Sequence, residues 1–409
     1  MRFRSNRLLV LLLVGVGLIH DLFAAEFEMK GELGQRFVYN DNIALNPIQK
    51  DSVFGFLLTP SIEAVRKSEV YEIAFAGKGD IRRYDDSRWN CTNYSLGISN
   101  AYRTRRNIFS LSGAYTTSCS YAQQLVDSGV LIPNNKTEDY QIAGSWTRQW
   151  TPRSQFILDG SFSRTKYSNN GSGTSNFLGN DSYTLNLSAN HRWNRLLLLD
   201  LKQFFSSIQY SGANSSTQNV FGFEVGGHYT IDPYWTFNAK GGPRWVEGAQ
   251  RNVSGLNATQ DSSLNLGYSA DVSLNYDSQT DKFLIAYSNS FAPSAIGQTL
   301  QTHSFGFSYS HRLTRFVFLD FHSDYSISQS INSSSAAAQT GQFNRDYLTV
   351  SAEIGWDFAK NWQLKGSHIF RRQDVQQDTN VANLIAGASA SNLVMLFINY
   401  KWDGIRGSQ

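Results

Sequence analysis

From Glu26 onward the side chains alternate in character with a period of two, not with the 3.6 of a helix. In YEIAFAGKGDIR (residues 71–82), aromatic, aliphatic and glycine residues alternate with small or charged ones. Successive side chains of a β-strand point to opposite sides of the sheet, so each strand would have one apolar face and one small or charged face. The pattern predicts an all-β chain.

The connections between these segments fall into two length classes that alternate along the chain. Eighteen segments are recognised, with sixteen as the alternative count, and eight of the connections have only one to five residues. The remaining connections are longer and rich in Asn, Ser, Gly, Thr and Gln. A soluble sandwich has no reason to sort its loops by length, whereas an outer-membrane barrel has short periplasmic turns and long extracellular loops. The sequence therefore predicts a single-chain transmembrane antiparallel β-barrel of about 18 strands.

Closure of the barrel follows from the backbone. In hydrocarbon every N–H and C=O group needs a partner, so the first strand is expected to pair with the last. Proline cannot donate to a ladder, and two of the seven prolines, Pro60 and Pro243, fall inside expected strands. They are expected at bulges or strand ends.

Aromatic residues gather beside the short turns. They make up 14% of the chain, and a mean hydropathy of −0.35 argues against a bundle of transmembrane helices. Aromatic side chains concentrate at membrane–water interfaces. The residues expected to form a girdle at the periplasmic interface are Tyr102, Trp150, Trp193, Trp235, Tyr276, Phe316, Trp362 and Trp402.

The first 25 residues have the plan of a secretory signal peptide. Three arginines precede an apolar run from Leu8 to Ile19, and small residues follow at Ala24 and Ala25. We therefore expect a signal peptide over residues 1–25, a barrel over residues 26–409 and a location in a Gram-negative outer membrane. Removing three arginines and one aspartate lowers the net charge of +3 to +1, which argues against a nucleic-acid partner.

The first expected hairpin carries a family resemblance. In FVYNDNIALNPIQKDSVFGFLLTPSIEA, Tyr39, Asp41, Asn42 and Ile43 mark the first loop, and Asp51 and Pro60 follow. These residues and the plan of the whole mature chain resemble the β-barrel porin family of Gram-negative outer membranes, in its second named group. The resemblance implies a porin fold and, for some members, a link to exopolysaccharide export.

The charged residues of the expected strands lie on the face opposite the apolar one, which in a barrel is the lumen. An eighteen-stranded barrel is wider than side chains alone can fill. The charges can therefore line a water-filled pore and set a transverse field, or form a salt-bridged network that fills a closed lumen. The residues expected to line the pore are Glu72, Lys78, Asp80, Arg82, Asp200, Lys202, Glu224, Lys240, Arg244, Asp320, His322, Asp324, Glu353, Lys365 and Arg371.

The sharpest local cluster is LDFHSDY, in which Asp320, His322 and Asp324 share the lumen face. A barrel hydrolase would pair such a histidine with a serine. A phospholipase would present both residues to lipid, whereas these side chains are expected to point inward. Pore lining is therefore favoured over catalysis, and no enzyme is predicted.

No metal or cofactor is predicted. Asp41, Asn42 and Asp51 carry the hard oxygens that Ca²⁺ prefers, but their spacing matches no calcium loop, and such residues commonly form turns. No glycine-rich phosphate loop, paired-cysteine zinc motif or histidine pair at ligand spacing occurs.

Cys91 and Cys119 lie symmetrically about a short turn, in an oxidising compartment. Pairing of Tyr94 and Leu96 with the apolar face of the next strand would place the two sulfurs on opposite faces. A bulge would be needed to join them, so the sequence leaves the disulfide open.

The function expected first is passive diffusion of small hydrophilic solutes through a porin-like channel. The alternative is an exopolysaccharide secretion conduit, or a structural outer-membrane component that works with partner proteins. The expected partners are outer-membrane lipid, the outer-membrane assembly machinery, and small hydrophilic solutes or polysaccharide. Substrate, ion selectivity and oligomeric state do not follow from the sequence.

Overall fold

The computed structural model describes residues 26–119, 135–169, 178–211, 216–250, 261–293, 299–330, 343–377 and 387–408. The expected signal peptide, residues 1–25, lies outside this range. The strands are β1 (Glu26–Asn40), β2 (Val53–Lys67), β3 (Tyr71–Tyr84), β4 (Cys91–Arg103), β5 (Asn107–Ser118), β6 (Asn135–Thr151), β7 (Ser154–Asn169), β8 (Asn180–Arg192), β9 (Leu197–Tyr210), β10 (Ser216–Thr230), β11 (Trp235–Gln250), β12 (Asp261–Asp277), β13 (Asp281–Pro293), β14 (Thr299–Arg312), β15 (Val317–Ser330), β16 (Phe343–Ala359), β17 (Trp362–Gln377) and β18 (Gly387–Ser408).

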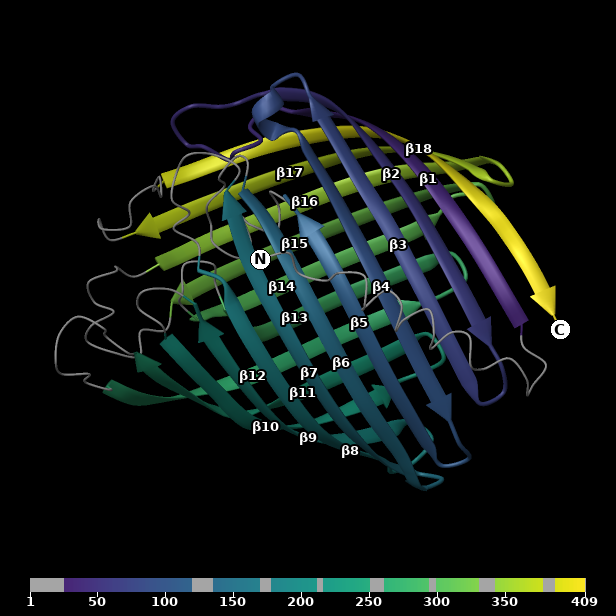
Figure 1. Ribbon diagram of the computed structural model, residues 1–409, viewed down its shortest axis with the longest axis vertical. Coiled ribbons are helices and arrows are strands. Elements are labelled where there is room, and N and C mark those ends of the chain that lie inside the picture. The colour runs from purple at the N-terminus through teal and green to yellow at the C-terminus, as the bar shows by residue number, and fades with distance from the viewer. Residues whose placement is uncertain are drawn as a thin grey trace, which may run out of the picture.

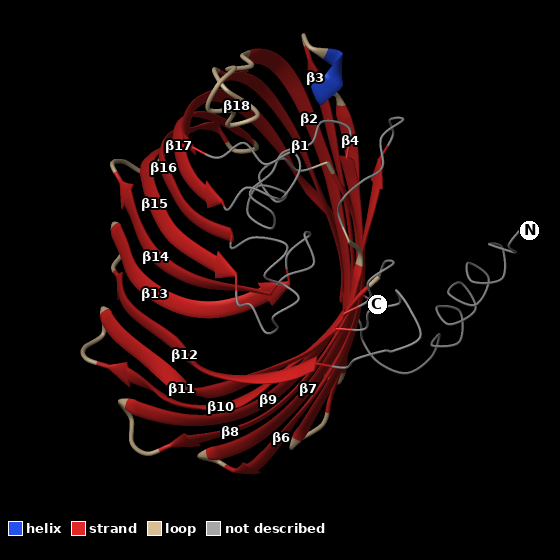
Figure 2. Cartoon of the chain, turned by 90° about the vertical axis from the view of Figure 1, so that its left-hand side faces the viewer, coloured by secondary structure: helices blue, strands red, loops and turns tan. Residues whose placement is uncertain are grey.

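All eighteen strands belong to one closed antiparallel sheet. Each strand pairs with its neighbours in sequence, and β1 pairs with both β2 and β18. The front and back walls cross at an angle in Figure 1, as the tilted strands of a barrel do, and Figure 2 shows the sheet curving round on itself. The predicted count of eighteen is confirmed, and the alternative of sixteen is wrong.

The seam between the first and last strands contains one irregularity. The register shifts between Met29 and Gly31 of β1, where β18 has an extra residue. Gly404 adopts a φ of +81°, and a Cβ at this position would lie 1.5 Å from the carbonyl oxygen of Met29. Only glycine fits a positive φ so close to another backbone, so this residue allows β18 to bulge and still close the barrel.

The two mid-strand prolines are not at bulges or strand ends, so that prediction is wrong. Pro60 pairs with Leu33 of β1, while the β2–β3 ladder is interrupted beside it and resumes in the same register. The β10–β11 ladder is interrupted beside Pro243 in the same way. Nearby glycines make room: a Cβ on Gly79 would lie 3.2 Å from the Pro60 ring, and one on Gly242 would lie 1.9 Å from a carbonyl oxygen of β10.

The short connections lie together at one end of the barrel, which we call the short-turn end, and β1 begins and β18 ends there. At the opposite, long-loop end, a 3-10 helix, η1 (Ser87–Trp89), connects β3 to β4. Among the described residues, no helix is long and apolar enough to cross a membrane.

Candidate functional site: the barrel lumen and its two rims

The register in which neighbouring strands pair assigns each strand residue to the outer or the inner face of the barrel. Large apolar side chains such as Leu185 and Leu187 are exposed on the outer face, and their partners in register, Phe205 of β9 for example, share that face. The alternate positions therefore face the lumen. All fifteen residues expected to line the pore occupy these alternate positions.

Most of the lumen charges are paired within the wall. Four ion pairs join charged residues of the lumen face. Their nitrogen-to-oxygen distances are 2.5 Å for Arg82–Asp80, 2.8 Å for Lys365–Glu353, 3.2 Å for Lys240–Asp271 and 3.8 Å for Lys202–Glu224. A fifth pair, Arg103–Glu72 at 2.7 Å, lies near the short-turn end. These side chains lie along the wall instead of reaching across the bore, so their charges largely cancel locally.

Two of the fifteen residues do not present a charge to the lumen water. Arg244 is only 5% exposed, and Glu224 only 9%. The Arg244 guanidinium lies 3.3 Å from the centre of the Phe291 ring and donates a hydrogen bond to the carbonyl oxygen of Tyr268 over 2.9 Å. Ladder pairing between β12 and β13 stops at Ala270 and Asn289, so Arg244 fills the gap where these strands separate.

The inward cluster on β15 does not form a catalytic relay. His322 pairs with Asp324, and Asp320 accepts a hydrogen bond of 2.5 Å from the hydroxyl of Ser310 on β14. Ser351 donates to the backbone carbonyl of His322, not to its ring. Among the described residues, no serine hydroxyl contacts the ring of this histidine.

The first loop folds inward across the long-loop end. Asn42 is fully buried, and its Nδ2 donates to the carbonyl oxygens of Asn46 and Ala390, each over 3.0 Å. Leu45 packs against Tyr347 on the lumen face of β16 and accepts a hydrogen bond of 3.2 Å from Gln373 of β17. The loop is therefore fixed against the inner wall of β16–β18, which narrows the bore on that side.

The neighbouring loop supports this arrangement. Trp89 of η1 is buried against Ile43 of the first loop and Val53 of β2. The N-cap of η1 is Asp86, and the Arg88 guanidinium beside it holds the pKa of this carboxyl below its usual value. The two loops thus share one small apolar core at the rim.

The residues weighed as calcium ligands have other roles. Asp41 accepts two hydrogen bonds from Asn392 of β18, and Asp51 lies 3.9 Å from the guanidinium of Arg88. No group of three or more His, Cys, Asp or Glu residues within the described ranges could hold a metal ion.

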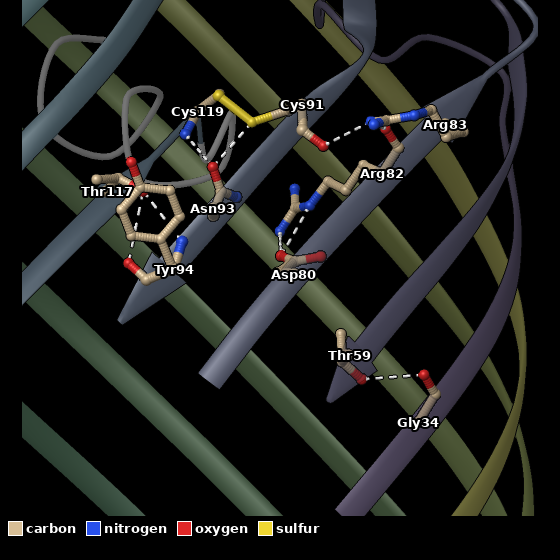
Figure 3. A network of polar contacts seen from close by, with 10 residues as sticks. All are labelled: Gly34, Thr59, Asp80, Arg82, Arg83, Cys91, Asn93, Tyr94, Thr117 and Cys119. Atoms are coloured by element: carbon tan, nitrogen blue, oxygen red, sulfur yellow. Dashed lines mark hydrogen bonds and ion pairs between the residues drawn. A yellow bond between two sulfur atoms is a disulfide. The ribbon is translucent and has the colours of Figure 1, made fainter. Parts of the chain in front are cut away.

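Cys91 and Cys119 form a disulfide, with their Cα atoms 6.2 Å apart (Figure 3). The β4–β5 ladder ends at Tyr94 and Thr117, and Cys119 follows the last residue of β5. Its N–H donates to the side-chain oxygen of Asn93 over 2.8 Å instead of to the ladder. Because the chain leaves the strand there, face alternation no longer separates the two sulfurs, and no bulge is needed.

The eight expected girdle residues all lie at the short-turn end, and several are exposed on the outer face. Trp235 and Tyr276 pack with ring centres 4.8 Å apart, and Trp362 packs against Tyr400 at 4.9 Å. Tyr102 lies beside the turn between β4 and β5.

A second ring of outward aromatic residues lies near the long-loop end. It was not among the predictions made from the sequence. Tyr115 of β5 packs against Tyr140 of β6 with ring centres 4.8 Å apart, and Phe162 packs against Tyr183 at 5.0 Å. On β4, Tyr94 and Tyr102 lie eight residues apart, which for a tilted strand corresponds to roughly 20–25 Å of membrane thickness. The two rings therefore border an apolar band of bilayer height.

Comparison with known proteins supports the fold. No family model and no curated protein matches the chain. The crystal structure of the unliganded ferric citrate transporter FecA matches with a TM-score of 0.51 and 8% identity, over 92% of this chain and 79% of that chain. OccAB4 of Acinetobacter baumannii has a TM-score of 0.49 and 9% identity, over 93% of this chain and 98% of that chain. OpdK of Pseudomonas aeruginosa has a TM-score of 0.45 and 11% identity, over 93% of this chain and 99% of that chain.

The match to FecA shows a shared fold. The compartment follows from the surface of the barrel itself: a closed sheet leaves no unpaired edge for hydrocarbon to meet, and its outer face carries an apolar band between two aromatic rings. The chain is an outer-membrane β-barrel.

Proposed function

We propose that the barrel is a channel for passive diffusion of small hydrophilic solutes across the outer membrane. The observation that carries this proposal is the charged inner face of a closed eighteen-stranded wall. A barrel of this size leaves an aqueous passage unless something fills it. In addition, a cavity of about 1010 Å³ near the short-turn end is lined by charged residues that include Lys30, Glu32 and Lys78.

The proposed orientation places the short turns in the periplasm and the long loops outside the cell. Residues 1–25 would direct export as a signal peptide, and the assembly machinery would insert the mature chain. The inward first loop would then narrow the entrance from the cell exterior. Because the lumen charges are mostly paired within the wall, we expect only weak selection between anions and cations.

Conductance of the purified protein in a planar lipid bilayer tests the proposal. Stable ohmic openings whose size scales with bulk salt conductivity are the expected result. A correctly folded barrel that stays silent would contradict passive diffusion and would favour the alternative of a partner-dependent conduit. Heat-modifiable migration in a gel, which reports the closed barrel, serves as the folding control.

A further inference from the structure

The outer face of β6 and β7 carries a cluster of positively charged side chains. The cluster lies just beyond the ring of outward aromatic residues near the long-loop end. Lys136, Arg164 and Lys166 occupy outward positions in the same alternation as Tyr140 and Phe162. Each charge lies over an aromatic ring: Lys136 over Tyr94 at 5.4 Å, Arg164 over Phe162 at 5.8 Å and Lys166 over Tyr140 at 5.6 Å. Contact with the rings holds these charges at the membrane interface.

The register places the three side chains close together. Lys166 is directly opposite Glu138, so it is the diagonal neighbour of Lys136 on the adjacent strand. Diagonal neighbours on one face of a sheet lie roughly 7–8 Å apart, and residues two apart on one strand are spaced similarly. The cluster therefore has the dimensions of a lipid headgroup.

The three cations are not equally free. Arg164 binds Asp181 through two hydrogen bonds of 2.6 and 2.5 Å, so its guanidinium is already occupied. Lys136 forms a loose ion pair with Glu138 at 3.8 Å, which is too long for a hydrogen bond. Lys166 is exposed and makes no ion pair with any residue in the described part of the chain. The ammonium groups of both lysines thus keep N–H donors for a ligand.

We propose that Lys136 and Lys166 bind a phosphate group of a phosphorylated glycolipid in the outer leaflet, with the Arg164–Asp181 pair holding one side of the site. The apolar band below the cluster would take the acyl chains, the two ammonium groups would bind the phosphate, and Glu138 and Asp181 would accept hydrogen bonds from sugar hydroxyls. The position of the cluster selects a membrane lipid as its occupant. The proposal requires the orientation proposed above, with the long loops outside the cell. It does not require that the barrel conducts solutes.

The test measures binding of bisphosphorylated lipid A to the detergent-solubilised full chain by native mass spectrometry. For the double variant Lys136→Gln/Lys166→Gln we expect binding about 10- to 30-fold weaker, because each lysine near anionic lipid contributes on the order of one decade of affinity or somewhat less. Lys136→Arg/Lys166→Arg should retain binding. A loss in the arginine variant as well would overturn the assignment to charge.

Arg148→Gln is the matched control. Arg148 lies on β6, faces outward and sits 5.5 Å from the Trp150 ring, but at the short-turn end. Its removal should leave lipid A binding unchanged. Equal binding by the wild type and the double glutamine variant, equal binding of dephosphorylated lipid A, or full competition by phosphatidylglycerol would each overturn the proposal. A silent channel in a planar bilayer would leave this result unaffected, so the two proposals fail separately.

Discussion

The side-chain amide of Asn42 donates a hydrogen bond of 3.0 Å to the carbonyl oxygen of Ala390, across 348 residues of sequence. The contact joins the loop between β1 and β2 to the start of the last strand. It also fixes the part of the loop that lies against the inner wall of β16–β18, so the position of the loop depends on this side chain.

Asn42→Ala should therefore release the first loop and increase single-channel conductance. Loss of hydrogen bonds from a fully buried amide should also lower the free energy of unfolding by about 2–3 kcal/mol. Ile48→Ala is the control, because Ile48 lies in the same loop and is 83% exposed. Conductance equal to wild type in both variants would show that this loop does not narrow the passage.

Replacing both cysteines by alanine should destabilise the barrel without unfolding it. The disulfide closes a loop over a sequence separation of 28 residues, for which the chain-entropy model gives about 3–4 kcal/mol. Urea unfolding in lipid vesicles, with and without reductant, measures the effect. Reductant should lower the stability of the wild type and leave the double variant unchanged.

Gly404→Ala should impair closure of the seam between β1 and β18. A Cβ at this position would meet the Met29 carbonyl, and the positive φ adds a cost of roughly 1–3 kcal/mol. The measurement is the fraction of chains that migrate as the compact barrel in an unheated gel. Gly407→Ala provides the control, since nothing lies within 4 Å of the Cβ that it adds. Equal folding of the two variants would rule out this role for Gly404.

Lys365→Gln should shift ion selectivity toward cations. The substitution leaves Glu353 without its partner at 2.8 Å, so the lumen gains net negative charge. A partly exposed charge in a wet bore is screened, and we expect roughly a twofold change in the permeability ratio. The reversal potential in a salt gradient measures it. Arg148→Gln removes a positive charge from the outward face of β6 and should have little effect.

The strand plan could be predicted from the sequence because a barrel repeats one rule at every residue. The alternation that puts Leu185 outside puts Thr184 inside, and no other part of the chain is needed to see it. The first loop could not be predicted in this way. Asn42 and Leu45 look like ordinary loop residues until Ala390, Tyr347 and Gln373 are brought beside them.

The disulfide between Cys91 and Cys119 could not be predicted from the sequence for a different reason. The register of β4 and β5 follows from the apolar residues, but the point at which the chain leaves that register depends on hydrogen bonds made by Asn93 and Thr117. The second aromatic ring was visible in the sequence, since Tyr94 and Tyr115 lie outward eight and six residues from Tyr102 and Phe109 on the same strands.

The closure of β1 on β18 also has a consequence for how the chain can be rewired. Glu26 and Ser408 are direct partners, as closely placed as the two ends of any short turn. Joining them through a few turn residues and cutting a long loop instead should give a circular permutant with the same wall. In such a molecule the order of the strands in the gene would change, while each strand would keep the same two neighbours in the barrel.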